Sequence, residues 1–258
     1  MSCVERNHSI SGVIITFNEE MNIERCIDSL KIVCDEIIVV DSYSQDRTKE
    51  ICLEKGVIFI ENGFEGHIQQ KNYALEQANY NYVLSLDADE ELSVELAESI
   101  LEIKGNLNQE AYKFNRFTNY CGKWIKHSGW YPDTKIRLWD KRKARWGGTN
   151  PHDQVLISKN SAAHLSGDLL HYSYYSMSEH IERSARYAKI AANAMHLNGK
   201  KYSTLNLLVN PIYRFFKDYM INKGFLDGYE GFVICVTNGY TTFLKYLYLR
   251  ALKKGLPV

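Results

Sequence analysis

The stretch YVLSLDADEE, residues 82–91, places four carboxylates directly after an apolar run. The run, residues 82–86, has the length and composition of a buried strand. Side chains two positions apart in an extended segment point to the same side, so Asp87 and Asp89 can converge. Two carboxylates, water and phosphate oxygens suit Mg²⁺ or Mn²⁺. The alternative is that Asp89 only caps the following helix, whose dipole the glutamates complement.

Strands and helices alternate around this stretch. Apolar runs predict strands at 10–16, 36–41, 57–60 and 82–86, with helices between them at 21–33, 48–54 and 68–78. This order predicts an α/β fold with a Rossmann-like, mostly parallel sheet and helices on both faces. Ligands bind at the carboxyl ends of such strands. The polar residues at these ends are Thr16, Asn18, Glu19, Asp41, Asp87 and Asp89.

The pattern changes after Glu91. Residues 111–117, 135–139 and 169–173 predict further strands, and residues 121–132 and 147–154 predict loops, the second of them rich in glycine. Helical patterns follow at 178–197 and, as two or three helices, at 205–252. We therefore expect a catalytic domain over residues 1–177 and a helical C-terminal region over 178–258.

Composition excludes several classes of protein. The 258 residues carry no net charge, so no global signal for nucleic acid is present. The six cysteines are scattered without a C-x-x-C pair, which argues against structural zinc and a disulfide framework and favours a reducing, cytoplasmic setting. The first residues lack the pattern of a secretory signal peptide. Neither G-x-G-x-x-G nor a P-loop follows the first strand.

Four blocks within the first hundred residues resemble family 2 glycosyltransferases. They are VIITFNEE at 13–20, IVVDSYSQDRT at 38–48, QKNYA at 70–74 and LDADE at 86–90, in the family's order and spacing. HSGWYP at 127–132 and NKGFLDG at 222–228 are similar to segments of the bacterial lipopolysaccharide-core β-1,4-glucosyltransferase type. The resemblance implies a GT-A fold, a nucleotide-sugar donor, a divalent metal and inversion at the anomeric carbon.

The resemblance also implies roles in donor binding. It assigns Asp41 to the nucleotide base, typically uracil, Asp87 to the ribose and Asp89 to the metal. A carboxylate can accept hydrogen bonds from an imide N–H or from ribose hydroxyls, and the metal binds the diphosphate. The other residues expected to bind the donor are Thr16, Asn18, Glu19, Ser44 and Lys71.

Two of these assignments have structural alternatives. Asp41 could simply start a turn with Ser42 and Ser44. Lys71 could contact the donor or face solvent from its helix.

The glycine-rich segment 147–154 carries the candidate base. The resembled enzymes usually have His-Glu here and use the carboxylate as catalytic base, whereas this chain has His152 and Asp153. Asp is one methylene shorter, but an inverting transfer needs only one base that takes the acceptor proton. The alternative is that Asp153 holds a turn, in which case Asp133 is the next candidate.

Three residues are predicted to bind the acceptor: Trp130, Arg137 and His152. Aromatic faces stack on sugars and arginine pairs with phosphate. Trp130 could equally belong to the core, and Arg137 to a solvated strand face. His171 is predicted as a second metal ligand, because many GT-A enzymes supply a late histidine; a lone histidine in a strand is more often a satisfied core residue.

The C-terminal region is basic and aromatic. From Lys200 onward nine bases stand against three acids, and the longest uncharged run, 231–244, is 14 residues. That run is shorter than the roughly 20 residues needed to span a bilayer. Basic amphipathic helices suit an anionic membrane surface, which predicts peripheral contact with the inner face of the cytoplasmic membrane. The alternatives are a helical cap on the catalytic domain and a dimer interface.

These observations predict an inverting, metal-dependent hexosyltransferase that uses a nucleotide sugar, expected to be UDP-linked. Its acceptor would be a saccharide or a lipid-linked glycan of the cell surface, as in lipopolysaccharide core synthesis. A sugar-phosphate nucleotidyltransferase is an alternative, but such enzymes usually have a glycine-rich loop after the first strand. A non-catalytic binding scaffold is a third reading, against which the complete set of aspartates argues.

Overall fold

The computed structural model describes residues 8–149, 152–158 and 161–257, without the side chains of Thr149 and His152. Its main sheet has the order β3-β2-β1-β4-β8-β6-β11-β5, and β7 pairs with β6. The strands are β1 (Ile10–Thr16), β2 (Glu36–Asp41), β3 (Ile58–Glu61), β4 (Tyr82–Asp87), β5 (Glu90–Leu92), β6 (Ala111–Tyr120), β7 (Lys123–Trp124), β8 (Asp133–Asp140) and β11 (Ala162–Tyr174). The helices of this half are α1 (Ile23–Lys31), α2 (Thr48–Glu54), α3 (His67–Gln77) and α4 (Val94–Lys104).

Strand pairing confirms the predicted sheet. β1 pairs in parallel with β2 and with β4, and β2 with β3, while β8 joins β4 antiparallel. Thr16 is the register partner of Asp41, and Ile15 that of Asp87. The polar residues that end these three strands therefore lie at one level on one edge of the sheet.

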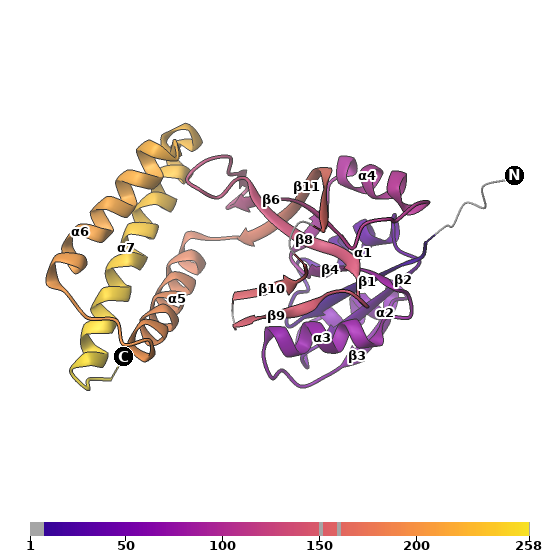
Figure 1. The fold of residues 1–258 in the computed structure, drawn as a ribbon, viewed down its shortest axis with the longest axis horizontal. Helices are drawn as coiled ribbons and strands as arrows, with labels where there is room; N and C mark the ends of the chain where they lie inside the picture. Colours follow the sequence, from indigo (N-terminus) through magenta and orange to yellow (C-terminus); the bar gives the residue numbers. More distant parts are fainter. Residues whose placement is uncertain (1–7, 150–151, 159–160, 258) are drawn as a thin grey trace, which may run out of the picture. The chain divides into compact units, whose positions relative to one another are not determined.

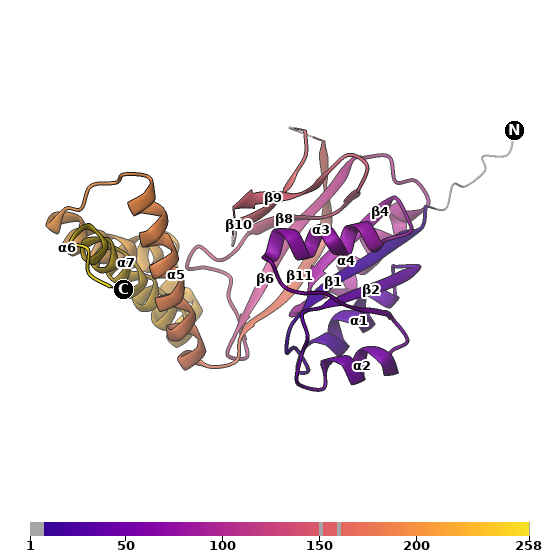
Figure 2. The ribbon, with the colours of Figure 1, turned by 90° about the horizontal axis from the view of Figure 1, so that it is seen from below.

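Alternation along the strands builds a core on each face of the sheet. In β1, Ile10 and Ile14 belong to a cluster with residues of α1 and α4, while Val13 belongs to a second cluster with residues of α3. This is the period of two that a strand requires when both of its faces are buried. Figure 2 shows α3 on the opposite side of the strands from α1 and α2.

The described part of the segment predicted as a flexible loop, 147–154, belongs to the two paired strands of a β-hairpin, so that prediction was wrong. β9 (Arg145–Thr149) pairs antiparallel with β10 (His152–Leu156), and Asp153 is the register partner of Gly148. Gly147 and Gly148 lower the strand propensity of this segment, so its sequence does not predict a strand. Residues 150–151 lie outside the described part of the chain. β5 was also missed, because only three residues form it.

The chain divides into two compact units. The first contains residues 1–116 and 133–172, and the second contains 117–132 and 173–258. The second unit therefore begins five residues earlier than the predicted helical region and includes the aromatic segment around Trp130.

The second unit is mainly helical. Its helices are α5 (Met177–Leu197), α6 (Thr204–Phe216), a π-helical turn at Lys217–Ile221, a 3₁₀ turn at Gly224–Asp227 and α7 (Gly228–Lys253). α7 packs against both α5 and α6 (Figure 1). Of the residues described, no helix combines the length and apolarity that crossing a membrane requires.

Candidate functional site

The loops that follow β1 and β2 are tied together by polar contacts. Asn18, held at a positive φ of 54°, donates its backbone N–H to Ser44 Oγ at 2.8 Å and accepts from the backbone N–H of Gln45 at 2.8 Å. The N–H of Glu19 donates to Thr48 Oγ1 at 2.9 Å. Asparagine tolerates this left-handed backbone better than most residues. Thr16 is buried at the end of β1, and its Oγ1 finds no hydrogen-bond partner among the described residues.

Asp41 is buried at the end of β2 and is held by one neighbour. Its Oδ2 accepts the backbone N–H of Ser44 at 2.7 Å, and its Oδ1 accepts the hydroxyl of the same serine. This is the side-chain turn weighed as the alternative for Asp41. The turn also fixes the orientation of the carboxylate, so a role in binding the nucleotide base stays a prediction.

Lys71 joins two of the predicted functional carboxylates. The side chain comes from the buried side of α3 and is 4% exposed, so it does not face solvent. Its Nζ lies 2.8 Å from Asp87 Oδ1 at the end of β4 and 2.8 Å from Asp153 Oδ2 in β10. It also lies 4.3 Å from the centre of the Trp146 ring. A single ammonium thus brings the predicted ribose ligand and the predicted base to one point.

A second buried cation, Arg137 of β8, lies on the other side of Asp87. Its Nη2 donates to Asp87 Oδ2 at 3.0 Å and to Oε1 of the fully buried Glu90 at 2.8 Å. Burial would raise the pKa of Asp87, but the charges of Lys71 and Arg137 outweigh it and hold that pKa well below its usual range. Arg137 is therefore neither solvated nor directed away from the site.

Three further residues of the site were not singled out from the sequence. Glu90 also accepts the backbone N–H of Asp87 at 3.0 Å, and Arg116 of β6 pairs with Asp133 at 2.8 Å. Trp146 of β9 lies beneath Lys71. Glu90 stood in the acidic run, and Arg116 lies in the alternating strand that was predicted. No local sequence pattern indicates Trp146, because its place depends on the pairing of β9 with β10.

Asp89 and His171 approach each other from different strands. His171 Nε2 of β11 lies 3.3 Å from Asp89 Oδ2, and the backbone carbonyl of Asp89 accepts the N–H of Tyr172 at 2.9 Å. Burial raises the pKa of Asp89, but the charge and hydrogen bond of His171 outweigh it, so the pKa is lowered overall. An imidazole and a carboxylate are both ligands that Mn²⁺ accepts.

The donor set fits a cation that a substrate helps to hold. Among the residues that the structure describes, no group of three or more histidine, cysteine or acidic side chains forms a ready cage. Asp89 and His171 supply two ligands, which leaves coordination positions for diphosphate oxygens and water. The fit is therefore that of a cation shared with a nucleotide diphosphate.

Comparison with known proteins identifies the family. A sequence model of glycosyl transferase family 2 matches residues 11–161, which include both blocks of aspartates and the hairpin with Asp153. The chain belongs to glycosyl transferase family 2. This confirms the resemblance drawn from the four sequence blocks.

Two relatives of the family match nearly end to end. A glycosyltransferase of Rickettsia typhi, described as uncharacterised, is 34% identical over 94% of this chain and 87% of its own length. The lipopolysaccharide core biosynthesis glycosyltransferase LpsC of Rhizobium meliloti is 27% identical over 96% of this chain and 95% of its own. Among solved structures, residues 1–349 of TarS from S. aureus in complex with UDP are 15% identical, with a TM-score of 0.46 over 96% and 92% of the two chains.

Trp130 and His152 of this family 2 chain were also predicted to bind the acceptor. Trp130 belongs to the second unit, where its ring lies 5.8 Å from that of Tyr120 and 6.0 Å from that of His180. This favours the alternative of a core position. The backbone of His152 begins β10, but its side chain lies outside the described part of the chain.

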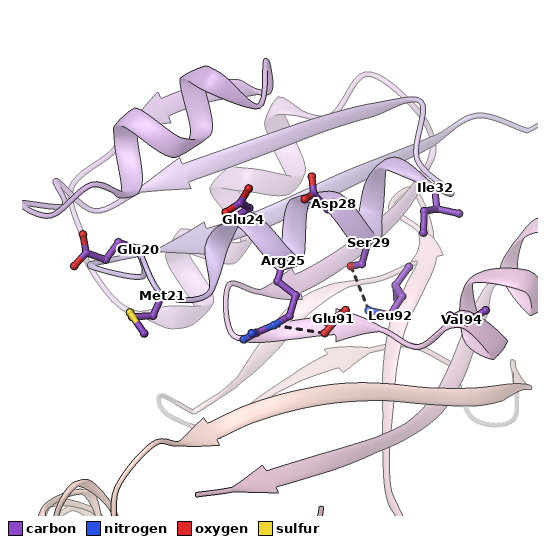
Figure 3. A pocket seen from close by; sticks show the side chains of 10 residues that line it. All are labelled: Glu20, Met21, Glu24, Arg25, Asp28, Ser29, Ile32, Glu91, Leu92 and Val94. Atoms are coloured by element: carbon purple, nitrogen blue, oxygen red, sulfur yellow. Dashed lines mark hydrogen bonds and ion pairs between the residues drawn. The ribbon is translucent and has the colours of Figure 1, made fainter. Parts of the chain in front are cut away.

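A surface groove is lined by residues other than those predicted to bind the donor. Its lining side chains come from α1, the residues before it, and the segment around β5 (Figure 3). Arg25 pairs there with Glu91 at 3.4 Å and stacks on the Tyr172 ring at 3.5 Å. None of the thirteen residues predicted as site residues lines it. The groove therefore adds no residue to the candidate site.

Proposed function

We propose that this protein is an inverting glycosyltransferase that moves a hexose from a UDP-sugar to a hydroxyl of a glycan acceptor. Membership of family 2 supports glycosyl transfer. The proposal of an inverting transfer from a UDP-sugar rests mainly on the double ion pair of Lys71. This side chain links Asp87 at a strand end with Asp153 of the hairpin. A single displacement needs a base close to a bound donor, and this ion pair brings the proposed base to the edge of the proposed donor site.

Asp153 is the proposed catalytic base. Its carboxylate takes the proton of the acceptor hydroxyl while that oxygen bonds to the anomeric carbon. The bond from the anomeric carbon to the UDP oxygen breaks in the same step, and its electron pair leaves with the diphosphate. Attack from the face opposite the leaving group inverts the anomeric centre. The carboxylate is 16% exposed, so it is accessible at the surface of the site.

The donor is proposed to bind along the strand ends. Asp87 accepts from the ribose, and its orientation is held by Lys71 and Arg137 at 2.8 Å and 3.0 Å. Asp41 accepts from the uracil imide, with Thr16, Asn18, Glu19 and Ser44 forming the surrounding loops. The buried Oγ1 of Thr16 has no hydrogen-bond partner in the part of the chain that the structure describes, which supports a polar ligand at this edge.

Asp89 and His171 are proposed to hold Mg²⁺ or Mn²⁺. Their separation of 3.3 Å supports joint ligation. The cation, when bound, neutralises charge on the leaving diphosphate. Loss of either ligand should therefore weaken donor binding as well as turnover.

The acceptor is proposed to be a saccharide or glycolipid of the cell surface. The relative named for lipopolysaccharide core biosynthesis supports this class, since it matches 96% of this chain. Arg137 and His152 remain the proposed contacts to it. A lipid-linked acceptor also implies contact of the second unit with an anionic membrane surface.

Hydrolysis of a panel of UDP-sugars, with and without Mn²⁺, tests the proposal. A slow, Mn²⁺-dependent release of UDP from one sugar class is expected, because water can replace the acceptor. Release of pyrophosphate from UTP and a sugar phosphate would instead identify a nucleotidyltransferase. Tight UDP-sugar binding without any turnover, in the presence of candidate glycan acceptors, would favour a scaffold.

A further inference from the structure

One helix of the second unit exposes a continuous apolar stripe. In α6, Leu205, Leu208, Val209, Ile212, Tyr213 and Phe216 are each between 49% and 68% exposed. We call these six residues the α6 outer face. Their spacing of three and four positions puts them on one side of a helix with 3.6 residues per turn.

The opposite side of α6 is already packed. Leu207 is buried, and Asn210 donates to the hydroxyl of Tyr246 in α7 at 2.7 Å. Gly239 of α7 lies so close to Pro211 that an added Cβ would meet its carbonyl oxygen at 3.1 Å. The helix is thus held by α7 on one side, and the α6 outer face is not needed for that packing.

The exposed charges of the segment around the α6 outer face, residues 199–228, are all positive. Lys200, Lys201, Lys217 and Lys223 flank it and are exposed. The acids between residues 199 and 228 are Asp218 and Asp227, and both are buried, at 1% and 4% exposure. Asp218 is paired with Arg214 at 2.6 Å. Within residues 199–228, the apolar stripe is therefore accompanied by exposed cations and by no exposed carboxylate.

We infer that the α6 outer face docks onto an anionic lipid surface, with α6 lying in the plane of the interface. Apolar side chains enter the boundary between headgroups and acyl chains, while the flanking lysines meet anionic headgroups. A second copy of this chain fits less well, because the same cations would face each other across the contact. At 13 residues, or about 20 Å, α6 is too short to span a bilayer.

This inference rests on the proposed membrane contact and names the surface that makes it. It depends on residues of the second unit alone, whereas the proposed chemistry uses residues of the first. A negative result in a lipid-binding test would therefore reject this inference and leave the proposed transfer reaction unaffected.

Co-sedimentation of the full chain with vesicles tests the inference. The probe is phosphatidylethanolamine with a minor share of phosphatidylglycerol, compared with pure phosphatidylcholine. The variant Leu208→Ser, Ile212→Ser, Phe216→Ser should lose at least about tenfold in partitioning, because three of the inserting side chains become polar. Added salt should weaken the binding of the parent, since it screens the lysines.

The matched control replaces exposed apolar residues of the first unit. The variant Ile32→Ser, Leu53→Ser, Leu101→Ser changes side chains that are 56%, 58% and 44% exposed, and it should bind vesicles like the parent. Equal loss in both triple variants would overturn the inference. So would parent-like binding by the α6 triple variant, or a parent dimer that this variant dissociates and that does not bind vesicles.

A milder substitution measures insertion itself. Phe216→Trp keeps an aromatic side chain, so the fold should be retained. Brominated acyl chains should quench the added fluorescence in vesicles that contain phosphatidylglycerol. Binding without any quenching beyond that of the parent protein would contradict insertion of the α6 outer face.

Discussion

The clearest exceptions to the ordinary rule of burial differ between the candidate site of the first unit and α6 of the second. The first unit buries charge, with Lys71, Glu90 and Arg137 each 4% exposed or less. The second unit exposes apolar surface, and Leu205 and Ile212 are 68% and 60% exposed. Buried charges and exposed apolar groups are the informative exceptions, because both are unfavourable unless something compensates them.

The compensation differs between the two units. In the first, each buried charge has a partner within the same unit, as in the contacts of Lys71 with Asp87 and Asp153. In the second, nothing described within the unit covers the α6 outer face. The first unit is therefore interpreted as a site for a charged small molecule, and the second as a surface for a larger, apolar partner.

The largest effect is expected at Asp153. Asp153→Asn keeps the size of the side chain but cannot accept the acceptor proton. Turnover should fall by roughly 10²–10⁴-fold, the usual contribution of a general base. Binding of UDP with Mn²⁺, measured by calorimetry, should be retained, because Asp41, Asp87 and Asp89 are unchanged.

Two further variants sharpen this result. Asp153→Glu restores the carboxylate at the length usual in the resembled enzymes and should keep measurable transfer. Asp28→Asn, on the exposed side of α1, should leave the rate unchanged. A transfer rate for Asp153→Asn within a few-fold of the parent would move the base elsewhere, with Asp133 as the next candidate.

The next effect concerns the buried ion pairs. Lys71→Met leaves Asp87 and Asp153 without their shared cation, and removing one partner of a buried pair costs about 3–5 kcal/mol of unfolding free energy. Lys49→Met is the matched control, because Lys49 pairs with Glu61 at 3.1 Å but is 49% exposed. The control should cost less than about 1 kcal/mol. Equal losses in urea unfolding would show that burial does not distinguish the two pairs.

A third prediction concerns pH and the second unit. Burial lowers the pKa of the His180 imidazole to about 4, against about 6.5 when unfolded. Below about pH 6.5 the unfolded chain binds a proton that the folded unit does not, so stability falls on acidification. The loss amounts to roughly 3 kcal/mol by about pH 4. His180→Gln should remove this part of the pH dependence of thermal unfolding, whereas His67→Gln, at an exposed histidine, should keep it. An unchanged acid profile in His180→Gln would contradict the assignment.

The smallest effect compares one helix cap in each unit. Ser93 Oγ accepts the N–H of Leu96 at 3.2 Å and that of Asp168 at 3.1 Å, whereas Ser176 Oγ accepts that of Glu179 at 3.2 Å. Ser176→Ala should cost about 1 kcal/mol, and Ser93→Ala more, because two donors lose their acceptor. Denaturant midpoints measure both, and a larger loss in Ser176→Ala would reverse the expected order.

Much of the fold could be predicted because local sequence patterns indicate where its strands and helices begin and end. β1, β2 and α2 have the predicted bounds, since apolar runs defined the two strands and a short helical segment after a turn defined the helix. β9 and β10 were missed, because Gly147 and Gly148 lower strand propensity and only pairing across the hairpin stabilises them. The boundary between the units could not be predicted either, since residues 117–132 join the second unit through tertiary contacts such as Lys126 N–H to Asp227 Oδ1 at 3.2 Å.

The site was predictable where residues cluster in sequence. Asp87, Asp89 and Glu90 stood together, and the topology of parallel strands brought Asp41 to the same edge. The position of Lys71 stayed open, because a cation in a helix can face either way until the partner in β10 is known. Arg116 and Trp146 enter the site through strand pairing between distant segments, which no local pattern records.

We propose that the carboxylates at the end of β4 bind a nucleotide through a divalent cation. Titration calorimetry of UDP with Mn²⁺ can decide this, using the parent, Asp89→Ala and the exposed control Asp28→Ala. We expect Mn²⁺-dependent binding by the parent and the control, and its loss in Asp89→Ala, because one remaining ligand cannot hold the cation against water. Unchanged affinity in Asp89→Ala, or parent binding that persists in EDTA, would rule out this role of the cation.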